Sequence, residues 1–185
     1  AKASGPLKFL LPTVRKSDRH HAALPYSKLP AFMSELRALQ SVSALALEFT
    51  ILTGCRTSEV IEAKWSEFDE NLWVIPAARM KVSKEHRVPL CDRAQAILEQ
   101  LRGLGREWVF ASRGSHLSNM AMLQCLRGMR PGLTVHGFRS TFRDWAADQT
   151  DYPHEVVEAA LAHTVSDAVV TAYRRTTFFD KRRDM

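Results

Sequence analysis

Cysteine is scarce in this sequence, and long apolar runs are absent from it. The three cysteines, Cys55, Cys91 and Cys125, are widely spaced in 185 residues and form no CxxC or cysteine–histidine ligand pattern. Neither a disulfide framework nor a zinc site is therefore indicated, and a reducing intracellular compartment is the default. No apolar stretch approaches the roughly 20 residues that cross a bilayer, and the first residues lack the basic and apolar regions of a signal peptide. We therefore expect no membrane partner and a cytoplasmic location.

Metal-ligand patterns are missing too, whereas positive charge is in excess. The seven histidines and twenty acidic residues show no cluster at ligand spacing, so no metal is expected and a metallonuclease is poorly supported. Lys and Arg outnumber Asp and Glu by 26 to 20, which gives a formal net charge of +6. Half of that excess lies between Tyr173 and Met185, where the net charge is +3. This balance suits a polyanionic partner such as nucleic acid.

The length of 185 residues fits one domain with a core of its own. Residues 1–24 show no sustained hydrophobic period, and we interpret them, His20 and His21 included, as a polar linker or arm before a domain over 25–185. Hydrophobic spacing predicts a fold that is mainly α with a small antiparallel β-sheet or hairpin. The expected helices are roughly 27–39, 42–53, 57–64, 92–103, 118–128, 137–149, 153–162 and 166–175, and the expected strands are 72–75 and 87–90.

Two connections in this arrangement present charged side chains. Gly54 is suited to a left-handed helix C-cap and Thr57 to the N-cap of the next helix, which leaves Arg56 in a tight turn between two helices. The segment between the two strands is polar and basic, and it carries Arg79, Lys81 and Lys84. Both connections can project cations while the flanking elements hold the backbone.

Short motifs around these and other positions occur in a distinctive order. They read Thr53-Gly54-Cys55-Arg56-Thr57-Ser58-Glu59, His136-Gly137-Phe138-Arg139, Leu161-Ala162-His163 and Ala172-Tyr173-Arg174, with Lys81 between the first two. The set resembles the catalytic domain of the tyrosine recombinases, the phage-integrase family, and in particular the integrases of prophages and genomic islands. The resemblance implies the tyrosine recombinase catalytic-domain fold and site-specific breakage and rejoining of DNA through a 3′-phosphotyrosine.

The chemistry of that reaction agrees with the residue types. Two guanidiniums, on Arg56 and Arg139, match phosphate oxygens with planar forks of donors and stabilise the added negative charge without metal. A tyrosine phenol, with a pKa near ~10, is a nucleophile that can leave again when the strand is rejoined. The resemblance assigns this role to Tyr173. It implies no cofactor, because the covalent intermediate stores the bond energy.

The remaining roles are implied by the resemblance alone. His163 donates a hydrogen bond to the scissile phosphate, and His136 assists proton transfer at the tyrosine. A lysine on the hairpin loop protonates the leaving 5′ oxygen; we favour Lys81, with Lys84 as the competitor. Glu59 orients arginine or histidine side chains and does not react itself.

Double-stranded DNA is the implied partner, with backbone contacts expected from Arg79, Lys84, Arg174 and Arg175. Other recombinase protomers, forming a tetramer in the full-length protein, and accessory DNA-bending proteins are further implied partners, in a nucleoid-associated bacterial or phage setting. Nothing in residues 1–24 resembles the DNA-binding domain that precedes the family's catalytic domain. We therefore expect an isolated catalytic domain that binds DNA weakly and forms no stable tetramer alone.

Two other functions remain open at this point. A type IB topoisomerase-like enzyme would use the same nucleophile and phosphate-binding residues to relax supercoils. A catalytically silent DNA-binding module would keep the fold for positioning or regulation, although binding alone would not need the tyrosine.

Overall fold

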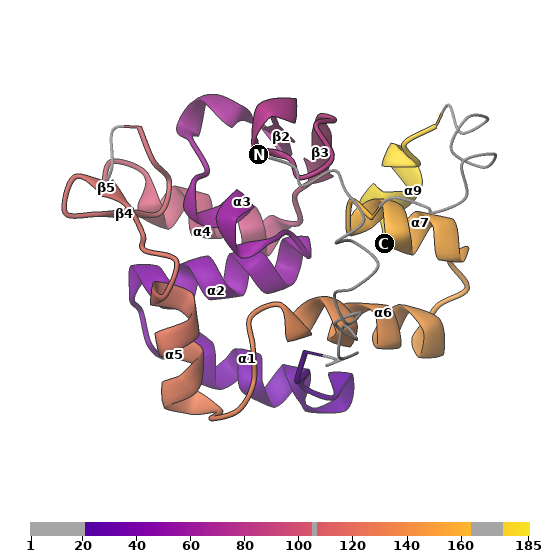
Figure 1. Cartoon of the computed structure of the whole chain (residues 1–185), viewed down its shortest axis with the longest axis horizontal. Coiled ribbons are helices and arrows are strands. Elements are labelled where there is room, and N and C mark those ends of the chain that lie inside the picture. The colour runs from indigo at the N-terminus through magenta and orange to yellow at the C-terminus, as the bar shows by residue number, and fades with distance from the viewer. Residues whose placement is uncertain (1–20, 105–106, 164–175) are drawn as a thin grey trace, which may run out of the picture.

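A computed structural model describes residues 21–104, 107–163 and 176–185. Helices dominate this part of the chain, and the strands are few and short (Figure 1). The helices are α1 (Leu29–Arg37), α2 (Val42–Thr53), α3 (Thr57–Ile61), α4 (Asp92–Leu101), α5 (Ala121–Met129), α6 (Gly137–Gln149), α7 (His154–Ala160) and α9 (Phe179–Asp184). The strands are β1 (Phe68–Asp69), β2 (Leu72–Ile75), β3 (His86–Pro89), β4 (Ala111–Ser112) and β5 (Ser115–His116). The expected fold class, mainly α with a small antiparallel sheet, is confirmed.

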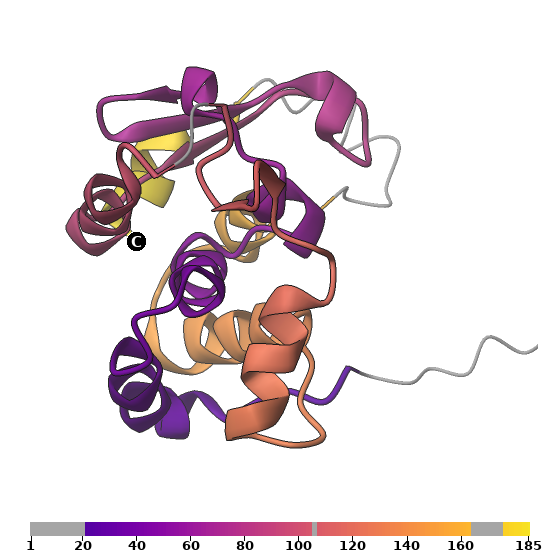
Figure 2. The same ribbon diagram turned by 90° about the vertical axis from the view of Figure 1, so that its left-hand side faces the viewer.

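Helix α2 forms the centre of the domain. Its sequence is apolar on most sides, as expected of a helix covered by neighbours all round, and α1, α3, α4 and α5 all pack against it. Figure 2 shows α2 between the three-stranded sheet at one end of the domain and α1, α5 and α6 at the other. The Ser41 hydroxyl caps the start of α2 by accepting a hydrogen bond from the Ala44 N–H at 3.1 Å.

The three-stranded sheet is antiparallel, in the order β1-β2-β3. Trp73 of β2 pairs with Val88 of β3, and both side chains are buried on the face that meets α2. Phe49 of α2 lies 5.5 Å from the Trp73 ring, measured between ring centroids. Aromatic packing therefore sets the sheet against the central helix.

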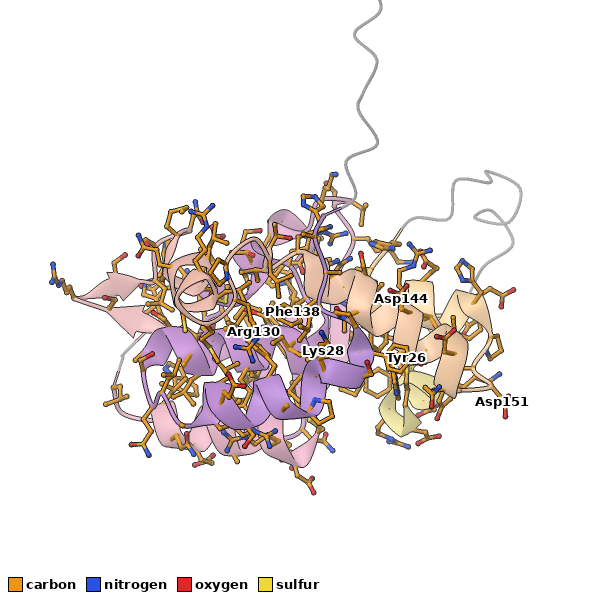
Figure 3. The ribbon with its side chains drawn as sticks, turned by 90° about the horizontal axis from the view of Figure 1, so that it is seen from below. Tyr26, Lys28, Arg130, Phe138, Asp144 and Asp151 are labelled. Carbon is orange, nitrogen blue, oxygen red and sulfur yellow. The ribbon has the colours of Figure 1, made fainter. Side chains whose placement is uncertain are left out.

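The opposite end of the domain is held by contacts between α1 and the chain around α6. Phe138 lies 5.3 Å from Phe32 of α1, measured between ring centroids. Arg130 donates a hydrogen bond to Glu35 at 2.7 Å, and its guanidinium covers the Phe32 ring. Figure 3 looks at this end and labels both Arg130 and Phe138. These contacts position the start of α6 relative to α1.

Residues 22–24 cross the start of α6. The Ala22 carbonyl accepts a hydrogen bond from the Thr134 N–H at 3.3 Å, and the Leu24 carbonyl accepts one from the Thr141 hydroxyl at 2.6 Å. At Gly137 a Cβ atom would meet the Ala22 oxygen at 2.1 Å, so only glycine permits this crossing. The last residues of the expected arm therefore pack on the domain. The boundary between an arm over 1–24 and a domain over 25–185 stays a prediction.

The C-terminal helix α9 docks on β3 and lies beside α7 (Figure 1). Arg182 is buried there and donates to the Arg87 carbonyl at 2.9 Å. His86 of β3 is also buried, and its Nε2 atom has no hydrogen-bond partner in the described part of the chain. Burial and the nearby Arg182 guanidinium lower the pKa of His86 to about 4.

Several local expectations were wrong in detail. The N-cap of α3 is Arg56 and not Thr57, α4 ends at Leu101 and not at 103, and α1 begins at Leu29 after a 3-10 turn at Tyr26–Lys28. Strand β3 lies one residue earlier than expected, and β1, the β4–β5 hairpin and α9 were not anticipated. Two-residue strands and a six-residue helix are too short to show a hydrophobic period. The expected helix at 166–175 lies outside the described residues.

No helix in the described ranges has the length and apolar character needed to span a membrane.

Replacing Gly137 by Ala should destabilise the domain by roughly 1–3 kcal/mol, because the added methyl collides with the backbone of residue 22. The matched control is Gly128→Ala in α5, where a Cβ meets nothing within 4 Å and helix propensity improves. Urea unfolding should separate the two variants. Equal stability of both would contradict the close crossing of residues 22–24 over α6.

Acidification should weaken the docking of β3, α7 and α9. The pKa of His86 is about 4 in the fold and 6.5 in its ordinary state. Its neutral form therefore contributes stability that is present above about pH 6.5 and is lost as the pH falls toward about 4, up to roughly 3 kcal/mol. The measurement is the urea midpoint as a function of pH between 7.5 and 4. It should fall less steeply with acidification in His86→Leu than in the unmodified chain. The control His154→Ala, whose side chain is 74% exposed, should keep the pH dependence of the unmodified chain.

Candidate active site

The α2–α3 turn holds Arg56 by backbone geometry. Gly54 ends α2 in the left-handed conformation, with φ of +63°, and a Cβ there would also approach Leu161 at 3.2 Å. Cys55 is buried, and Arg56 follows in extended conformation as the N-cap of α3. The expected turn is thus present, and it directs the Arg56 side chain away from α2.

Glu59 fixes both ends of Arg56. One carboxylate oxygen accepts the Arg56 backbone N–H at 2.7 Å, as the acid of a capping box does, and the other accepts from Arg56 Nη1 at 2.7 Å. The Glu59 side chain is 2% exposed, so this charge-assisted pair is shielded from water. Arg56 Nη2 donates to the Ala162 carbonyl at 3.3 Å.

Arg139 is a buried cation that joins three segments. From the first turn of α6 it donates to the Gly54 carbonyl through Nη1 and to the Leu161 carbonyl through Nη2, the latter at 2.5 Å. Nη2 also lies 2.7 Å from His163 Nε2. Burial and the neighbouring Arg56 guanidinium lower the pKa of Arg139. Two cations are thus held close together, an arrangement that an anion would complete.

His163 lies at the end of α7 with both ring nitrogens engaged. Nδ1 is 2.8 Å from the Glu158 carboxylate and Nε2 is 2.7 Å from Arg139 Nη2. Because a guanidinium can only donate, Nε2 is the acceptor and Nδ1 carries the proton toward Glu158. Burial lowers the pKa of His163, while the hydrogen bond to the Glu158 carboxylate opposes that change.

His136 precedes α6 and faces the same cluster. The residue is exposed, but its ring packs on His21 with 4.5 Å between ring centroids. Lost hydration, and then the cationic Arg139, lower the pKa of His136 to about 4. The ring is therefore neutral at pH 7 and can accept a proton.

The hairpin residues have different surroundings. Lys81 and Lys84 are exposed on the loop between β2 and β3, and neither joins the hydrogen-bonded cluster in the described part of the chain. Arg79 is 15% exposed and bonds to protein: its guanidinium contacts the Glu67 carboxylate and the Glu59 carbonyl. A 3-10 turn, Ala77–Arg79, separates Lys81 from the end of β2, so Lys81 does not directly follow the strand.

Tyr173, Arg174 and Arg175 lie outside the described residues, and their roles stay predictions. Within the described ranges, no group of three or more His, Cys, Asp or Glu side chains could hold a metal ion. The cluster that the structure assembles from the expected set contains Arg56, Glu59, Arg139 and His163, with His136 beside it.

Sequence reasoning missed two side chains that touch this cluster. Glu158, five residues before His163, is its carboxylate partner, and its second oxygen lies 2.9 Å from Arg143 Nε. His21 was interpreted as part of a polar arm. An acid in the last turn of a helix, five residues before a candidate histidine, is a signal that could have identified Glu158. Nothing local could have placed His21 on His136.

Comparison with known proteins agrees with this architecture. A lambda integrase dimer bound to a COC′ core site superposes with a TM-score of 0.62 at 20% identity, over 81% of this chain and 60% of that one. The lambda integrase catalytic core gives a TM-score of 0.58 at 20% identity, over 80% of this chain and 95% of that one. The fold is that of the tyrosine recombinase catalytic domain.

Sequence comparison names the family. The model of the phage integrase family matches residues 23–178. Prophage integrase IntA of Escherichia coli strain K12 is 39% identical over 171 aligned positions, and the alignment covers 85% of this chain and 41% of IntA. The integrase of Enterobacteria phage P4 is 31% identical over 193 aligned positions, and the alignment covers 90% of this chain and 44% of that protein. The chain belongs to the phage integrase family, and it spans less than half the length of these two relatives.

The Glu158→Gln variant should lower the pKa of His163 further, because the carboxylate favours the protonated ring and the amide does not. Asp148→Asn removes the same charge from an exposed position of α6 and should leave that pKa unchanged. An NMR titration of the histidine ring protons measures both. An unchanged pKa in Glu158→Gln would contradict the Glu158–His163 contact.

Proposed function

We propose that this chain is the catalytic domain of a site-specific DNA recombinase that integrates or excises mobile DNA. The observation that carries the proposal is the meeting of two guanidiniums at the backbone of residues 161–163. Arg56 bonds to the Ala162 carbonyl and Arg139 to the Leu161 carbonyl, with His163 beside them. Clustered cations with forked donors are suited to a phosphodiester in its five-coordinate transition state.

In the proposed reaction, the Tyr173 oxygen attacks the scissile phosphorus held by Arg56 and Arg139. His136 accepts the phenol proton, in keeping with its neutral ring. The bond from phosphorus to the 5′ oxygen breaks, and Lys81 gives that oxygen a proton. The result is a 3′-phosphotyrosine and a free 5′ hydroxyl. A 5′ hydroxyl of the partner duplex then attacks the phosphotyrosine, which releases Tyr173 and joins the new strands without an external energy source.

His163 has to change partners during this cycle. In the described arrangement its Nε2 accepts from Arg139 and its Nδ1 proton points to Glu158. Donation to a phosphate oxygen requires Nε2 to be protonated, and a bound phosphate that draws Arg139 away would free that nitrogen. Glu158 stabilises the imidazolium that results.

The proposed partners are duplex DNA and further protomers. Relatives of this fold have been solved on DNA, including a lambda integrase tetramer bound to a Holliday junction, with a TM-score of 0.62 and 20% identity. Lys84, Arg174 and Arg175 are the proposed backbone contacts, and accessory bending proteins would assemble the full-length complex. In the full-length protein, the domain over 25–185 would follow an upstream DNA-binding domain and a linking arm in the sequence. It would act at the bacterial nucleoid.

The test of this function is a covalent adduct formed without divalent metal. The chain is incubated with nicked duplexes that trap cleaved intermediates, in the presence of EDTA, and the attachment site is mapped by mass spectrometry. Tyr173→Phe should abolish the adduct and leave noncovalent binding unchanged, because only the nucleophilic oxygen is lost. Replacing Arg56 or Arg139 by Ala should slow cleavage at least about 100-fold.

Two results would change the proposal. Supercoil relaxation by the monomer without strand exchange would favour a topoisomerase, although the matched relatives are integrases and recombinases. No adduct after fusion to an upstream DNA-binding domain, with DNA binding verified, would favour a silent DNA-binding module.

A further inference from the structure

Arg79 is the last residue of the turn that leads from β2 into the basic loop. Its guanidinium forms a two-pronged contact with Glu67: Nε donates to one carboxylate oxygen at 2.9 Å and Nη2 to the other at 2.5 Å. The remaining nitrogen, Nη1, donates to the Glu59 carbonyl at 3.1 Å. All three nitrogens of the fork are thus bonded to protein, and the side chain is 15% exposed.

Glu67 is itself held firmly. Its side chain is 6% exposed, and it accepts a further hydrogen bond from the Trp73 indole N–H at 3.0 Å. Trp73 is fully buried in β2 against the central helix. The carboxylate therefore receives three N–H donors in a dry setting, where a forked ion pair is strong and geometrically strict.

The hydrogen bond from Arg79 to the Glu59 carbonyl connects the Glu67–Arg79 pair with the candidate active site. Arg79 bonds to the Glu59 backbone, while the Glu59 carboxylate holds Arg56 through its backbone N–H and its guanidinium. The chain beyond Arg79 continues through Met80, which is 4% exposed, to the exposed Lys81. The start of the loop is thus bonded to α3, the helix for which Arg56 is the N-cap.

We propose that Arg79 is a positioning residue for strand cleavage, which fixes the loop carrying Lys81 relative to the phosphate-binding Arg56 and does not itself contact DNA. This inference rests on the proposed function. Without Arg79, Glu59 would keep its own contacts with Arg56, whereas the loop would lose its attachment to α3. The consequence falls on the lysine that protonates the leaving oxygen.

The structure thereby separates Arg79 from the lysines of the same loop. The two-pronged contact with Glu67 already balances the charge of Arg79, and Glu62 lies 4.0 Å away. Arg139, by contrast, donates to carbonyls and to His163 and forms no ion pair with a carboxylate in the described part of the chain, so its charge stays available to a phosphate. Lys81 and Lys84 are exposed in the same loop. The expectation that Arg79 contacts DNA gives way here to a role inside the protein.

The experiment compares two nicked substrates, one with the natural 5′ oxygen at the scissile phosphate and one with sulfur in its place. A thiolate is far less basic than an alkoxide and leaves without a proton donor. Arg79→Ala should slow cleavage of the oxygen substrate by roughly 100-fold, the scale of a misplaced catalytic group. On the sulfur substrate, the cleavage rate of Arg79→Ala should lie within about threefold of the rate of the unmodified chain. Lys81→Ala should behave in the same way, because a sulfur leaving group does not need the general acid. Arg56→Ala should stay slow on both substrates.

Arg93→Ala is the matched control for a broken ion pair. Arg93 forms a similar two-pronged contact with the buried Glu48, at 2.8 and 2.7 Å, between α4 and α2. Its loss should lower thermal stability to a similar extent without a difference between the two substrates. Glu67→Gln removes the charge of the side chain but keeps its shape. Cleavage of the oxygen substrate should be slowed less than in Arg79→Ala, and the sulfur substrate should again restore the rate. If Arg79→Ala does not fold, the Glu67→Gln variant is used in its place.

The salt dependence of DNA affinity tests the competing role, in which Arg79 contacts a backbone phosphate. Removing a side chain that binds a backbone phosphate reduces the salt slope of DNA binding by about one. This result in Arg79→Ala, with equal slowing on both substrates, would overturn the proposal. Slowing on both substrates with an unchanged slope would also overturn it, since the effect would then be structural. Failure of the proposed function is distinguishable, because the unmodified chain would then form no Tyr173 adduct on either substrate.

Discussion

The buried guanidinium of Arg139 is the interaction on which this site depends. A cation taken out of water is costly unless hydrogen bonds replace its hydration. Arg139 obtains these bonds from the end of α2, through the Gly54 carbonyl, and from the end of α7, through Leu161 and His163. The need to satisfy one charge therefore joins segments that are 85 and 22 residues away from it in the sequence.

Buried carboxylates elsewhere in the fold obtain arginine partners for the same reason. Glu48 receives Arg37 and Arg93 and so connects α2 with α1 and α4; burial alone would raise its pKa, but the two arginines lower it. Glu67 and Arg79 connect the sheet with its loop. Arg37, Arg79 and Arg93 thus direct donors to carboxylates of the protein, although the composition counts them with every other cation. Charge counting alone could not make that distinction.

The sequence predicted well wherever a signal was local. Helix α6 has the expected bounds, 137–149, and α2 ends at Gly54 as its left-handed cap required. The turn that presents Arg56 and the pairing of β2 with β3 were also predictable from neighbouring residues. The β4–β5 hairpin and α9 were not, because elements this short have no period and form through contacts with distant segments. His21 was overlooked for a similar reason, because its partner His136 is far away in the sequence. Glu158, in contrast, lies only five residues before His163, and this local spacing was not used.

By itself, the sequence determined the family, the helical fold class and the order of the residues with chemical roles, since motif order and hydrophobic spacing are properties of the linear chain. Only the tertiary structure decided which of those side chains meet. It brought Arg56, Glu59, Arg139 and His163 together, placed His21 on His136, and turned Arg79 inward to Glu67. The physical reason is that an arginine has the same sequence signature whether its donors face phosphate or protein. Its partners are set by burial and by the geometry of backbone carbonyls far away in the chain.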